Sequence, residues 1–400
     1  MQIKNLMVRG IFDSRGRETL ELGLTNAQDQ EFWAQVSSGE SAGSREAVCL
    51  KLAAAKESVA KLKTVLVGRS FTSINEFDQQ LLAQDDSAQK NVLGGNVLLG
   101  LSVAMVRALA AEQQAQPWQL LKNEFFVVTR GEVVAKPAII ANFFEGGLHA
   151  NSNLDIQEYH IITAPNEDYY YTVAQLALIY EQLRAAYIAE HHTAAPISDE
   201  SALAANFKNN LQPILTLQKK LQELKLEQSW QLGIDAAASS FYQDKKYKFE
   251  RRKIDSPKLI AIYQHFRAVC PQLLWLEDPF AESDLDSFAA LRQVVPNEVN
   301  VIGDDLTCSN AELIRHAANN GAINAVIIKP NQIGTVSQSC QAINTARDNQ
   351  LKVIVSHRAR ETEDAFIIQL AKACNADAVK IGVPLKERVF KYNELLRLYE

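Results

Sequence analysis

The 400-residue sequence has little cysteine, and the placement of those cysteines excludes several kinds of protein. There are five of them, an odd number, and they are widely scattered. No two form a CxxC pair, so neither a disulfide framework nor a thiolate zinc site is indicated. This cysteine usage predicts a protein of the reducing cytoplasm. The five are Cys49, Cys270, Cys308, Cys340 and Cys374.

Long apolar runs are missing as well. No stretch approaches the roughly eighteen apolar residues that a membrane-spanning helix needs, so we expect no membrane span. The opening residues, MQIKNLMVRGIF, have no apolar core long enough for a signal peptide. No GxGxxG motif follows a strand-like run, which disfavours an open doubly wound sheet.

An excess of positive charge is also absent. The chain has 41 Lys and Arg against 47 Asp and Glu, so its net charge is −6. This balance helps solubility and argues against nucleic acid as the main partner, although a local basic pocket is compatible with it. Apolar content of 47% and charged content of 22% are typical of a folded soluble protein. The length suits two domains, one of them large.

Residues 1–130 predict a small α+β domain in which strands precede helices. Residues 20–24 alternate apolar and polar side chains with period two, and residues 31–36 form a second strand candidate. Residues 47–66 and 95–112 then carry apolar side chains at helical spacing. A polar break near residues 129–136 predicts a boundary with a second domain, residues 131–400.

The second domain alternates strand and helix patterns, which predicts a parallel α/β barrel of the (β/α)8, TIM-like type. An open doubly wound sheet is the alternative. The strand candidates are residues 137–142, 232–236, 273–277, 299–303, 325–328, 352–355 and 377–381, and helical stretches such as 310–319, 338–347 and 364–374 lie between them.

Three carboxylates follow successive strand candidates: Asp235, Glu277 and Asp304. Because the carboxyl ends of parallel strands meet at one mouth, we expect these side chains to converge. They would raise each other's pKa unless a cation neutralised them, and Mg²⁺ suits oxygen ligands. The alternative is that each acid caps the following helix. Three acids in succession favour the metal site.

Basic side chains follow the later strands. We expect Lys329 and Lys380 to enter the same mouth, where neighbouring positive charge lowers a lysine's pKa and a neutral lysine can act as a base. The alternative for each is a surface lysine with its charged end in water. His357 and Arg358 end another strand in the segment SHRARETED, where they either hold an anion or are exposed.

Several longer motifs accompany these residues. NQIGT at 331–335 occurs with SHR at 356–358 and ETED at 361–364. Others are GGLHA at 146–150, QE at 157–158, GID at 233–235, EDPF at 277–280 and GDDL at 303–306. With these motifs the chain resembles enolase, the glycolytic enzyme that interconverts 2-phosphoglycerate and phosphoenolpyruvate. The resemblance runs from FDSRG at 12–16 to YNELLR at 392–397, nearly the whole chain.

The resemblance implies a lyase with two Mg²⁺ ions per site, a small phosphorylated carboxylate as substrate, and a homodimer or larger homo-oligomer. Asp235, Glu277 and Asp304 match the family's ligands for the first Mg²⁺. Ser41 matches the loop serine that binds the second, substrate-linked Mg²⁺.

The catalytic roles come from the same resemblance. Lys329 matches the base that removes the proton from carbon 2, Glu200 matches the acid that helps the hydroxyl leave, and Glu158 matches its carboxylate partner. Removal of that proton adds a second negative charge to the substrate carboxylate, so cations are needed beside it. We expect Glu158 and Glu200 to share a proton. The remaining matches line the pocket or contact substrate: His149, Gln157, His357, Lys380 and, for the phosphate, Arg358.

Two loops depart from the family pattern. The metal loop PSGASTG is SSGESAG here, which places Glu40 beside the serine. The acid loop GDEGGFAP has Ser201 and Ala202 in place of two glycines, which restricts backbone angles with positive φ. Beyond the His-Arg pair, Ala359 replaces a phosphate-contacting serine and Arg360 replaces a glycine.

The retained charges and the altered loops leave three interpretations. Unneeded buried acids destabilise a fold, so retention of the ligands and lysines favours an active enolase. The first alternative is a paralogue acting on a different phospho- or phosphono-carboxylate, with Arg360 rebuilding the anion site. The second is a non-catalytic binding protein.

Overall fold

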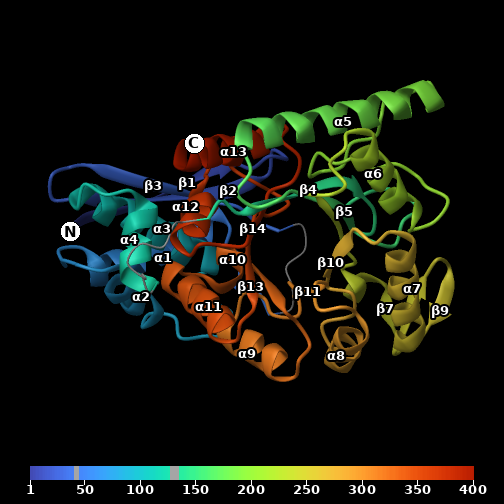
Figure 1. Cartoon of the computed structure of the whole chain (residues 1–400). Coiled ribbons are helices and arrows are strands. Elements are labelled where there is room, and N and C mark those ends of the chain that lie inside the picture. Colours follow the sequence, from blue (N-terminus) through green and yellow to red (C-terminus); the bar gives the residue numbers. More distant parts are fainter. Residues whose placement is uncertain (40–44, 127–134) are drawn as a thin grey trace.

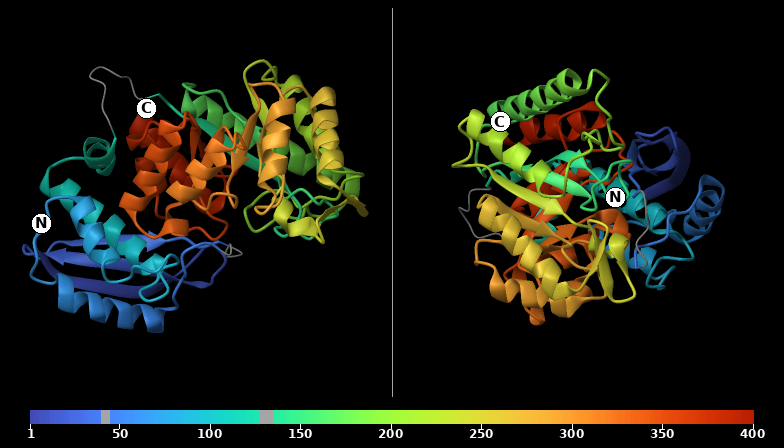
Figure 2. Two further views of the ribbon diagram at one scale, coloured as in Figure 1. Left: turned by 90° about the horizontal axis from the view of Figure 1, so that it is seen from below. Right: turned by 90° about the vertical axis from the view of Figure 1, so that its right-hand side faces the viewer.

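The computed structural model describes residues 1–39, 45–126 and 135–400. Within these residues the chain forms an antiparallel sheet covered by helices and, beside it, a closed barrel (Figures 1 and 2). Glu40 and Ser41 lie outside the described residues, as does the expected boundary between residues 130 and 131.

The N-terminal part is a three-stranded meander with helices. Strands pair in the order β1-β2-β3, and every residue of β2 except the first is buried. Helices α1 and α3 pack on this sheet, and α3 also contacts the barrel helices α10 and α11. The elements are β1 (Ile3–Phe12), β2 (Glu18–Asn26), β3 (Glu31–Val36), α1 (Leu52–Leu66), α2 (Ile74–Leu82), α3 (Gly95–Glu112) and α4 (Pro117–Phe125).

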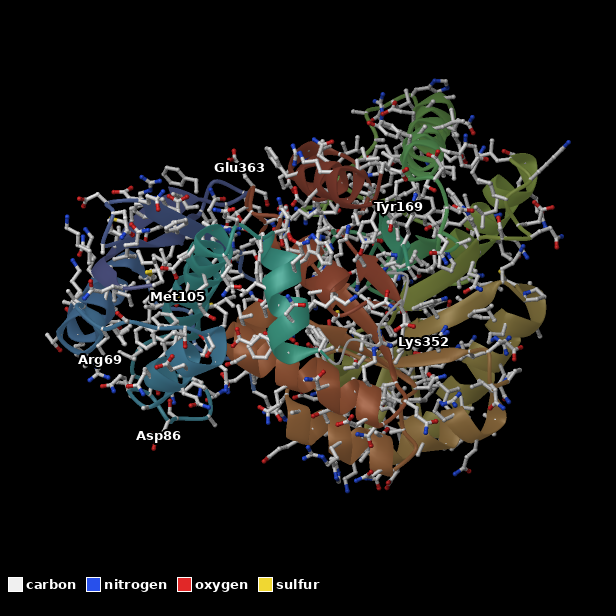
Figure 3. All side chains as sticks on the ribbon, turned by 60° about the vertical axis from the view of Figure 1, so that its left-hand side comes forward. Arg69, Asp86, Met105, Tyr169, Lys352 and Glu363 are labelled. Atoms are coloured by element: carbon white, nitrogen blue, oxygen red, sulfur yellow. The ribbon has the colours of Figure 1, made fainter. Side chains whose placement is uncertain are left out.

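Two details of this part bear on the expectations. The helix expected from residue 47 begins at Leu52, and residues 47–51 are not helical. Helix α3 is long and apolar enough by composition to cross a membrane, but it is mostly buried inside the protein. Its burial is that of a core helix, and its Met105 points into the interior, whereas Arg69, Asp86 and Glu363 lie on the outside (Figure 3).

The larger part is an eight-stranded closed barrel, which confirms the α/β barrel fold. Its strands follow the order β10-β11-β12-β13-β14-β4-β5-β6. One strand was not expected: β5 runs antiparallel to both β4 and β6, so the barrel is not parallel throughout. The strands are β4 (Ala138–Glu145), β5 (Glu158–Ile162), β6 (Gln231–Asp235), β10 (Leu273–Glu277), β11 (Asn300–Gly303), β12 (Ala325–Ile328), β13 (Lys352–Ser356) and β14 (Ala378–Lys380).

Helices surround the barrel, and one of them starts later than expected. Helix α12 begins at Phe366 and not at residue 364, so the acids of residues 361–364 all precede the helix. The helices are α5 (Tyr169–His191), α6 (Gln212–Glu223), α7 (Ser256–Val269), α8 (Leu285–Val294), α9 (Ala311–Asn319), α10 (Pro330–Ile333), α11 (Val336–Asp348), α12 (Phe366–Ala373) and α13 (Val389–Tyr399). A small sheet of β7 (Tyr242–Gln243), β8 (Lys246–Phe249) and β9 (Arg252–Ile254) follows β6.

The inside of the barrel is filled, so chemistry is confined to its mouth. A separate apolar cluster, including Ile140, Trp275, Ile327 and Ile354, occupies the interior. Trp275 lies so close to Gly233 that a Cβ there would come within 2.9 Å of the Trp275 Cβ.

Candidate active site

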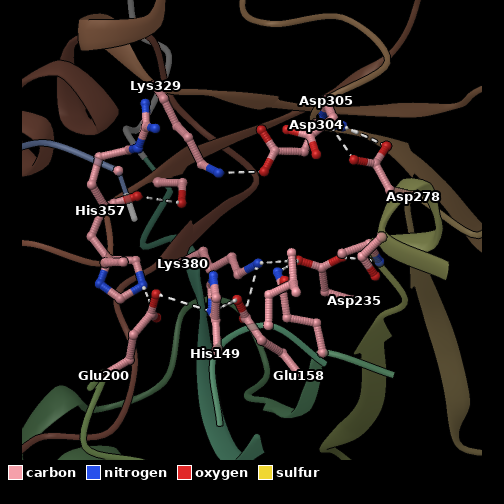
Figure 4. A pocket seen from close by; sticks show the side chains of 18 of the residues that line it. His149, Glu158, Glu200, Asp235, Asp278, Asp304, Asp305, Lys329, His357 and Lys380 are labelled. Atoms are coloured by element: carbon pink, nitrogen blue, oxygen red, sulfur yellow. Dashed lines mark hydrogen bonds and ion pairs between the residues drawn. The ribbon is translucent and has the colours of Figure 1, made fainter. Parts of the chain in front are cut away.

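The predicted acids lie at the ends of three neighbouring strands, and Figure 4 shows two of them, Asp235 and Asp304. Asp235 ends β6, Glu277 ends β10 and Asp304 follows β11, and all three are buried. Strand β10 pairs with β6 on one side and β11 on the other, and Glu277 is in register with Asp235. The strand pairing therefore brings the predicted metal ligands to one edge of the barrel.

Lys380, at the end of β14, lies among these acids. Its Nζ donates to both carboxylate oxygens of Glu277 at 2.8 Å and lies 3.4 Å from Asp235 Oδ2 and 3.1 Å from Glu158 Oε2. Burial disfavours the ammonium, but these carboxylates outweigh burial, so the pKa of Lys380 is raised well above its usual value. For Glu277, burial and then the charge of Asp235 raise the pKa well above the usual range.

Lys329 follows β12 and donates a hydrogen bond to Asp304. Burial favours its neutral form, yet the Asp304 carboxylate outweighs burial and raises the pKa of Lys329. With protein groups as their only neighbours, both lysines therefore favour the protonated form. Without a metal ion, each lysine is governed by the carboxylate against it, and the lowering expected beside a divalent cation stays a prediction.

Two acids that the sequence reasoning did not assign complete this side of the mouth. Asp278 accepts hydrogen bonds from the backbone N–H of Asp304 at 3.1 Å and of Asp305 at 2.7 Å. Ligand oxygens of Asp278, Asp304 and Asp305 lie within 4.8 Å of one another. Among the described residues, the expected triad of Asp235, Glu277 and Asp304 is not grouped this closely. Burial and then Asp304 raise the pKa of Asp305 to about 7. The signal in the sequence that could have identified Asp278 and Asp305 is their position directly after Glu277 and Asp304.

The opposite side of the mouth holds Glu200 between two histidines. His149 Nδ1 lies 3.5 Å from Glu200 Oε1 and 3.8 Å from Glu158 Oε1. His357 Nε2 lies 3.5 Å from Glu200 Oε2. Burial, followed by the charge of Arg388, lowers the pKa of His357 well below its usual value. Gln157 Nε2 lies 3.5 Å from Asp235 Oδ2, so this predicted residue also reaches the mouth.

Glu158 does not behave as the expected proton-sharing partner. Although burial raises its pKa, Lys380 and then His160, 2.8 Å away, lower it well below the usual range. Glu158 is therefore a charged carboxylate held between two basic groups. The proposed proton sharing between Glu158 and Glu200 is wrong for this arrangement.

The loop that carries Glu200 keeps a tight turn without its glycines. Ser201 has φ +73°, and the N–H of Ser198 donates to the carbonyl of Ala202 at 2.8 Å. Leu203 then pairs with Phe144 of β4. A left-handed conformation at a non-glycine residue costs about 1–2 kcal/mol. A serine in this conformation therefore leaves strain in the turn.

The predicted phosphate arginine is already paired. Arg358 donates to both oxygens of Glu46, at 2.9 and 3.2 Å, and to Asn331 Oδ1 at 2.9 Å. Glu46 was not predicted because it belongs to the N-terminal part and is distant in sequence from every barrel strand. The Ala359 carbonyl accepts a hydrogen bond from the Arg388 guanidinium, and the backbone of Arg360 pairs with that of Ser38.

Most of these side chains line a cavity of about 290 Å³, but Glu277 is not among its described lining residues. Arg360 is not among its described lining residues and instead borders an adjoining cavity with Arg358. The acid excess leaves room for further cations, and carboxylates are the ligands that Mg²⁺ prefers, so the residues fit a metal. Its described lining contains seven acids and three cations, namely Glu46, Glu158, Glu200, Asp235, Asp278, Asp304 and Asp305 against Lys329, Arg358 and Lys380.

The structure is that of an α/β-barrel protein whose mouth brings together acids that could hold a divalent cation and lysines that could hold an anion. Residues 133–400 match the family described as "Enolase, C-terminal TIM barrel domain", and residues 3–121 match "Enolase, N-terminal domain". The chain is 31% identical over 411 residues to an enolase of Ehrlichia canis, covering 98% of this chain and 95% of the relative. It is 32% identical over 414 residues to enolase 2 of Lactococcus lactis, covering 100% and 96%.

The chain belongs to the enolase family. Membership supports an enolase-type, hydro-lyase function on a small phosphorylated carboxylate. Enolases use Mg²⁺, and the acidic groups at the barrel mouth could bind a metal.

Proposed function

We propose that this protein catalyses the Mg²⁺-dependent, reversible dehydration of 2-phospho-D-glycerate to phosphoenolpyruvate in glycolysis. The observation that carries the proposal is the placement of Lys329 and Glu200 on opposite sides of one cavity (Figure 4). An elimination needs a base on one side of the substrate and a proton donor on the other. In this cavity Lys329 would be the base and Glu200 the proton donor.

The residues divide the work as follows. Lys329 accepts the proton from carbon 2, and the Lys380 ammonium stabilises the charge that then grows on the substrate carboxylate. Glu200 gives a proton to the departing hydroxyl, and His149 Nδ1 and His357 Nε2 each lie 3.5 Å from one of its oxygens. Asp235, Glu277 and Asp304, with Ser41, would hold two Mg²⁺ ions. When bound, Mg²⁺ supplies positive charge beside the substrate carboxylate and beside Asp304, which otherwise keeps Lys329 protonated.

The test is a steady-state assay on 2-phosphoglycerate that follows phosphoenolpyruvate absorbance with Mg²⁺ and with a chelator. We expect Mg²⁺-dependent turnover that Lys329→Ala abolishes. The matched control is Lys258→Ala, because Lys258 is exposed on α7. No turnover by a folded, Mg²⁺-binding protein would refute the proposal.

A second candidate is turnover of a different phospho- or phosphono-carboxylate. The Arg358–Glu46 pair favours it, since a carboxylate that occupies the arginine reduces its capacity for a doubly charged phosphate. A panel of such acids, assayed beside 2-phosphoglycerate, separates the two. Absence of metal binding in calorimetry would instead favour a non-catalytic protein. The homodimer remains part of the proposal, and light scattering measures it.

A further inference from the structure

Glu145 is a buried acid that none of the proposed roles uses. It is the last residue of β4, its side chain is fully buried, and Asn142 Nδ2 donates a hydrogen bond to its Oε1 at 2.6 Å. Its Oε2 has no hydrogen-bond partner among the described residues. Burial and then the charge of Glu200 raise the pKa of Glu145 well above its usual value. A carboxylate in this position is therefore unfavourable unless a cation lies beside its Oε2.

Two neighbouring side chains also carry a buried atom that lacks a hydrogen bond among the described residues. These atoms are His149 Nδ1 and Glu200 Oε2. Ligand atoms of Glu145, His149 and Glu200, one from each, lie within 4.8 Å of one another. His149 Nδ1 lies 3.5 Å from Glu200 Oε1 (Figure 4). Metal ions bind nitrogen and oxygen at about 2.0–2.2 Å, so one ion among these three side chains could contact all of them after a small shift.

The backbone brings the three side chains together. Between Glu145 and His149 the chain makes a tight turn, in which Gly147 has φ +52°. A side chain at that angle would be strained, so the turn that returns His149 to Glu145 depends on glycine. The Glu145 N–H donates to the Leu203 carbonyl at 3.1 Å, which attaches the loop that carries Glu200 to the end of β4. The grouping is thus part of the fold and does not depend on one side-chain rotamer.

Glu158 is also close but already has cationic neighbours. His149 Nδ1 lies 3.8 Å from Glu158 Oε1. The other oxygen of Glu158 lies 3.1 Å from Lys380 Nζ and 2.8 Å from His160 Nε2. Among the described residues Glu145 Oε2 has no comparable partner. Two carboxyl groups and one imidazole therefore remain for an added ion, and none of the three is a proposed Mg²⁺ ligand.

We propose that Glu145, His149 and Glu200 form a further metal site, which takes a first-row dication that favours imidazole, with Zn²⁺ as the test ion. Carboxylate oxygen and imidazole nitrogen are ligands of zinc, whereas Mg²⁺ prefers oxygen ligands alone. His149 and Glu200 line the cavity and Glu145 does not, so the ion lies in the cavity wall with a fourth position open to water. Asn142 orients the Glu145 carboxylate through its other oxygen.

Occupation of this site opposes turnover. A metal ion bound to Glu200 takes the carboxyl group that is proposed to give its proton to the departing hydroxyl. Zn²⁺ should therefore inhibit the enzyme even at saturating Mg²⁺, and a chelator that removes Zn²⁺ selectively should restore the rate. This consequence rests on the proposed function, whereas metal binding itself does not.

The first test is crystallographic and needs no activity. Crystals grown with Mg²⁺ are soaked in Zn²⁺, and diffraction is measured on both sides of the zinc absorption edge. The anomalous difference map should show a zinc peak between Glu145, His149 and Glu200. A map without a peak at this place would overturn the proposal. The map uses the wild-type protein, so it decides the question even if a variant does not fold.

The second test measures Zn²⁺ affinity in solution. Protein saturated with Mg²⁺ competes for Zn²⁺ with a chromophoric chelator, and Glu145→Gln should weaken binding about tenfold or more. The matched control is Glu190→Gln on α5, because Glu190 lies beside the exposed His191 and His192, another place where an acid adjoins imidazoles. Equal affinity in wild type and Glu145→Gln, or a loss confined to the control variant, would overturn the proposal.

The third test is inhibition of turnover on 2-phosphoglycerate at saturating Mg²⁺. The Zn²⁺ concentration that halves the rate, taken relative to each protein's own rate without Zn²⁺, should be about tenfold higher in Glu145→Gln than in wild type. An equal inhibitory concentration in the two proteins would overturn the assignment of inhibition to this site. Absence of turnover in wild type refutes the proposed function alone, since the map and the affinities stand independently.

Discussion

Removal of Lys380 should destabilise the protein strongly, and Mg²⁺ should restore much of the loss. In Lys380→Met the oxygens of Glu277, Glu158 and Asp235 lose a cation that lies 2.8 to 3.4 Å from them. All four side chains are at most 6% exposed, so water cannot replace the lost charge. Breaking one buried ion pair costs about 3–5 kcal/mol, and we expect a loss of that size in the free energy of unfolding.

The measurement is urea denaturation followed by circular dichroism, with a chelator and then with excess Mg²⁺. The loss should be smaller at pH 6 than at pH 8, because Glu277, whose pKa is already raised, can take up a proton and become neutral. Mg²⁺ should raise the midpoint of the variant more than that of wild type, since it supplies the missing charge. The exposed-lysine control is Lys258→Met. A loss below about 1 kcal/mol in chelator, or equal stabilisation by Mg²⁺, would show that Lys380 does not neutralise these acids.

Two further outcomes follow from the local geometry. Ser201→Gly should raise the free energy of unfolding by about 1 kcal/mol, because glycine adopts φ +73° without strain; an unchanged urea midpoint would contradict this. Buried Asp78 accepts a hydrogen bond from the Ser337 N–H at 2.8 Å, and burial raises its pKa to about 6. Between about pH 4 and 6 the native protein keeps a proton that the unfolded chain has released, so stability should fall by about 3 kcal/mol as pH rises through that window. Asp78→Asn should remove this part of the pH dependence, and urea midpoints at pH 4.5 and 7.5 measure it.

Most of the barrel was predictable because strand and helix periodicities are local properties of the sequence. The barrel strands β10 and β12 begin and end where the patterns predict. Strand β5 was missed because it is only five residues long, and its direction depends on which neighbours it pairs with. Helix α1 begins late because the N–H groups of Ala47 and Val48 donate to the carbonyls of Gln332 in α10 and of Gln89.

The sequence by itself determined which chemical groups reach the barrel mouth, because a residue directly after a strand points there whatever its neighbours are. It could not determine the charge state of those groups, which depends on the closest partner in space. Lys329 and Lys380 are protonated because Asp304 and Glu277 lie against them. Arg358 is paired with Glu46 across 312 residues of chain. Only the tertiary structure brings such partners together, and burial then makes each pairing decisive by excluding the water that would otherwise screen it.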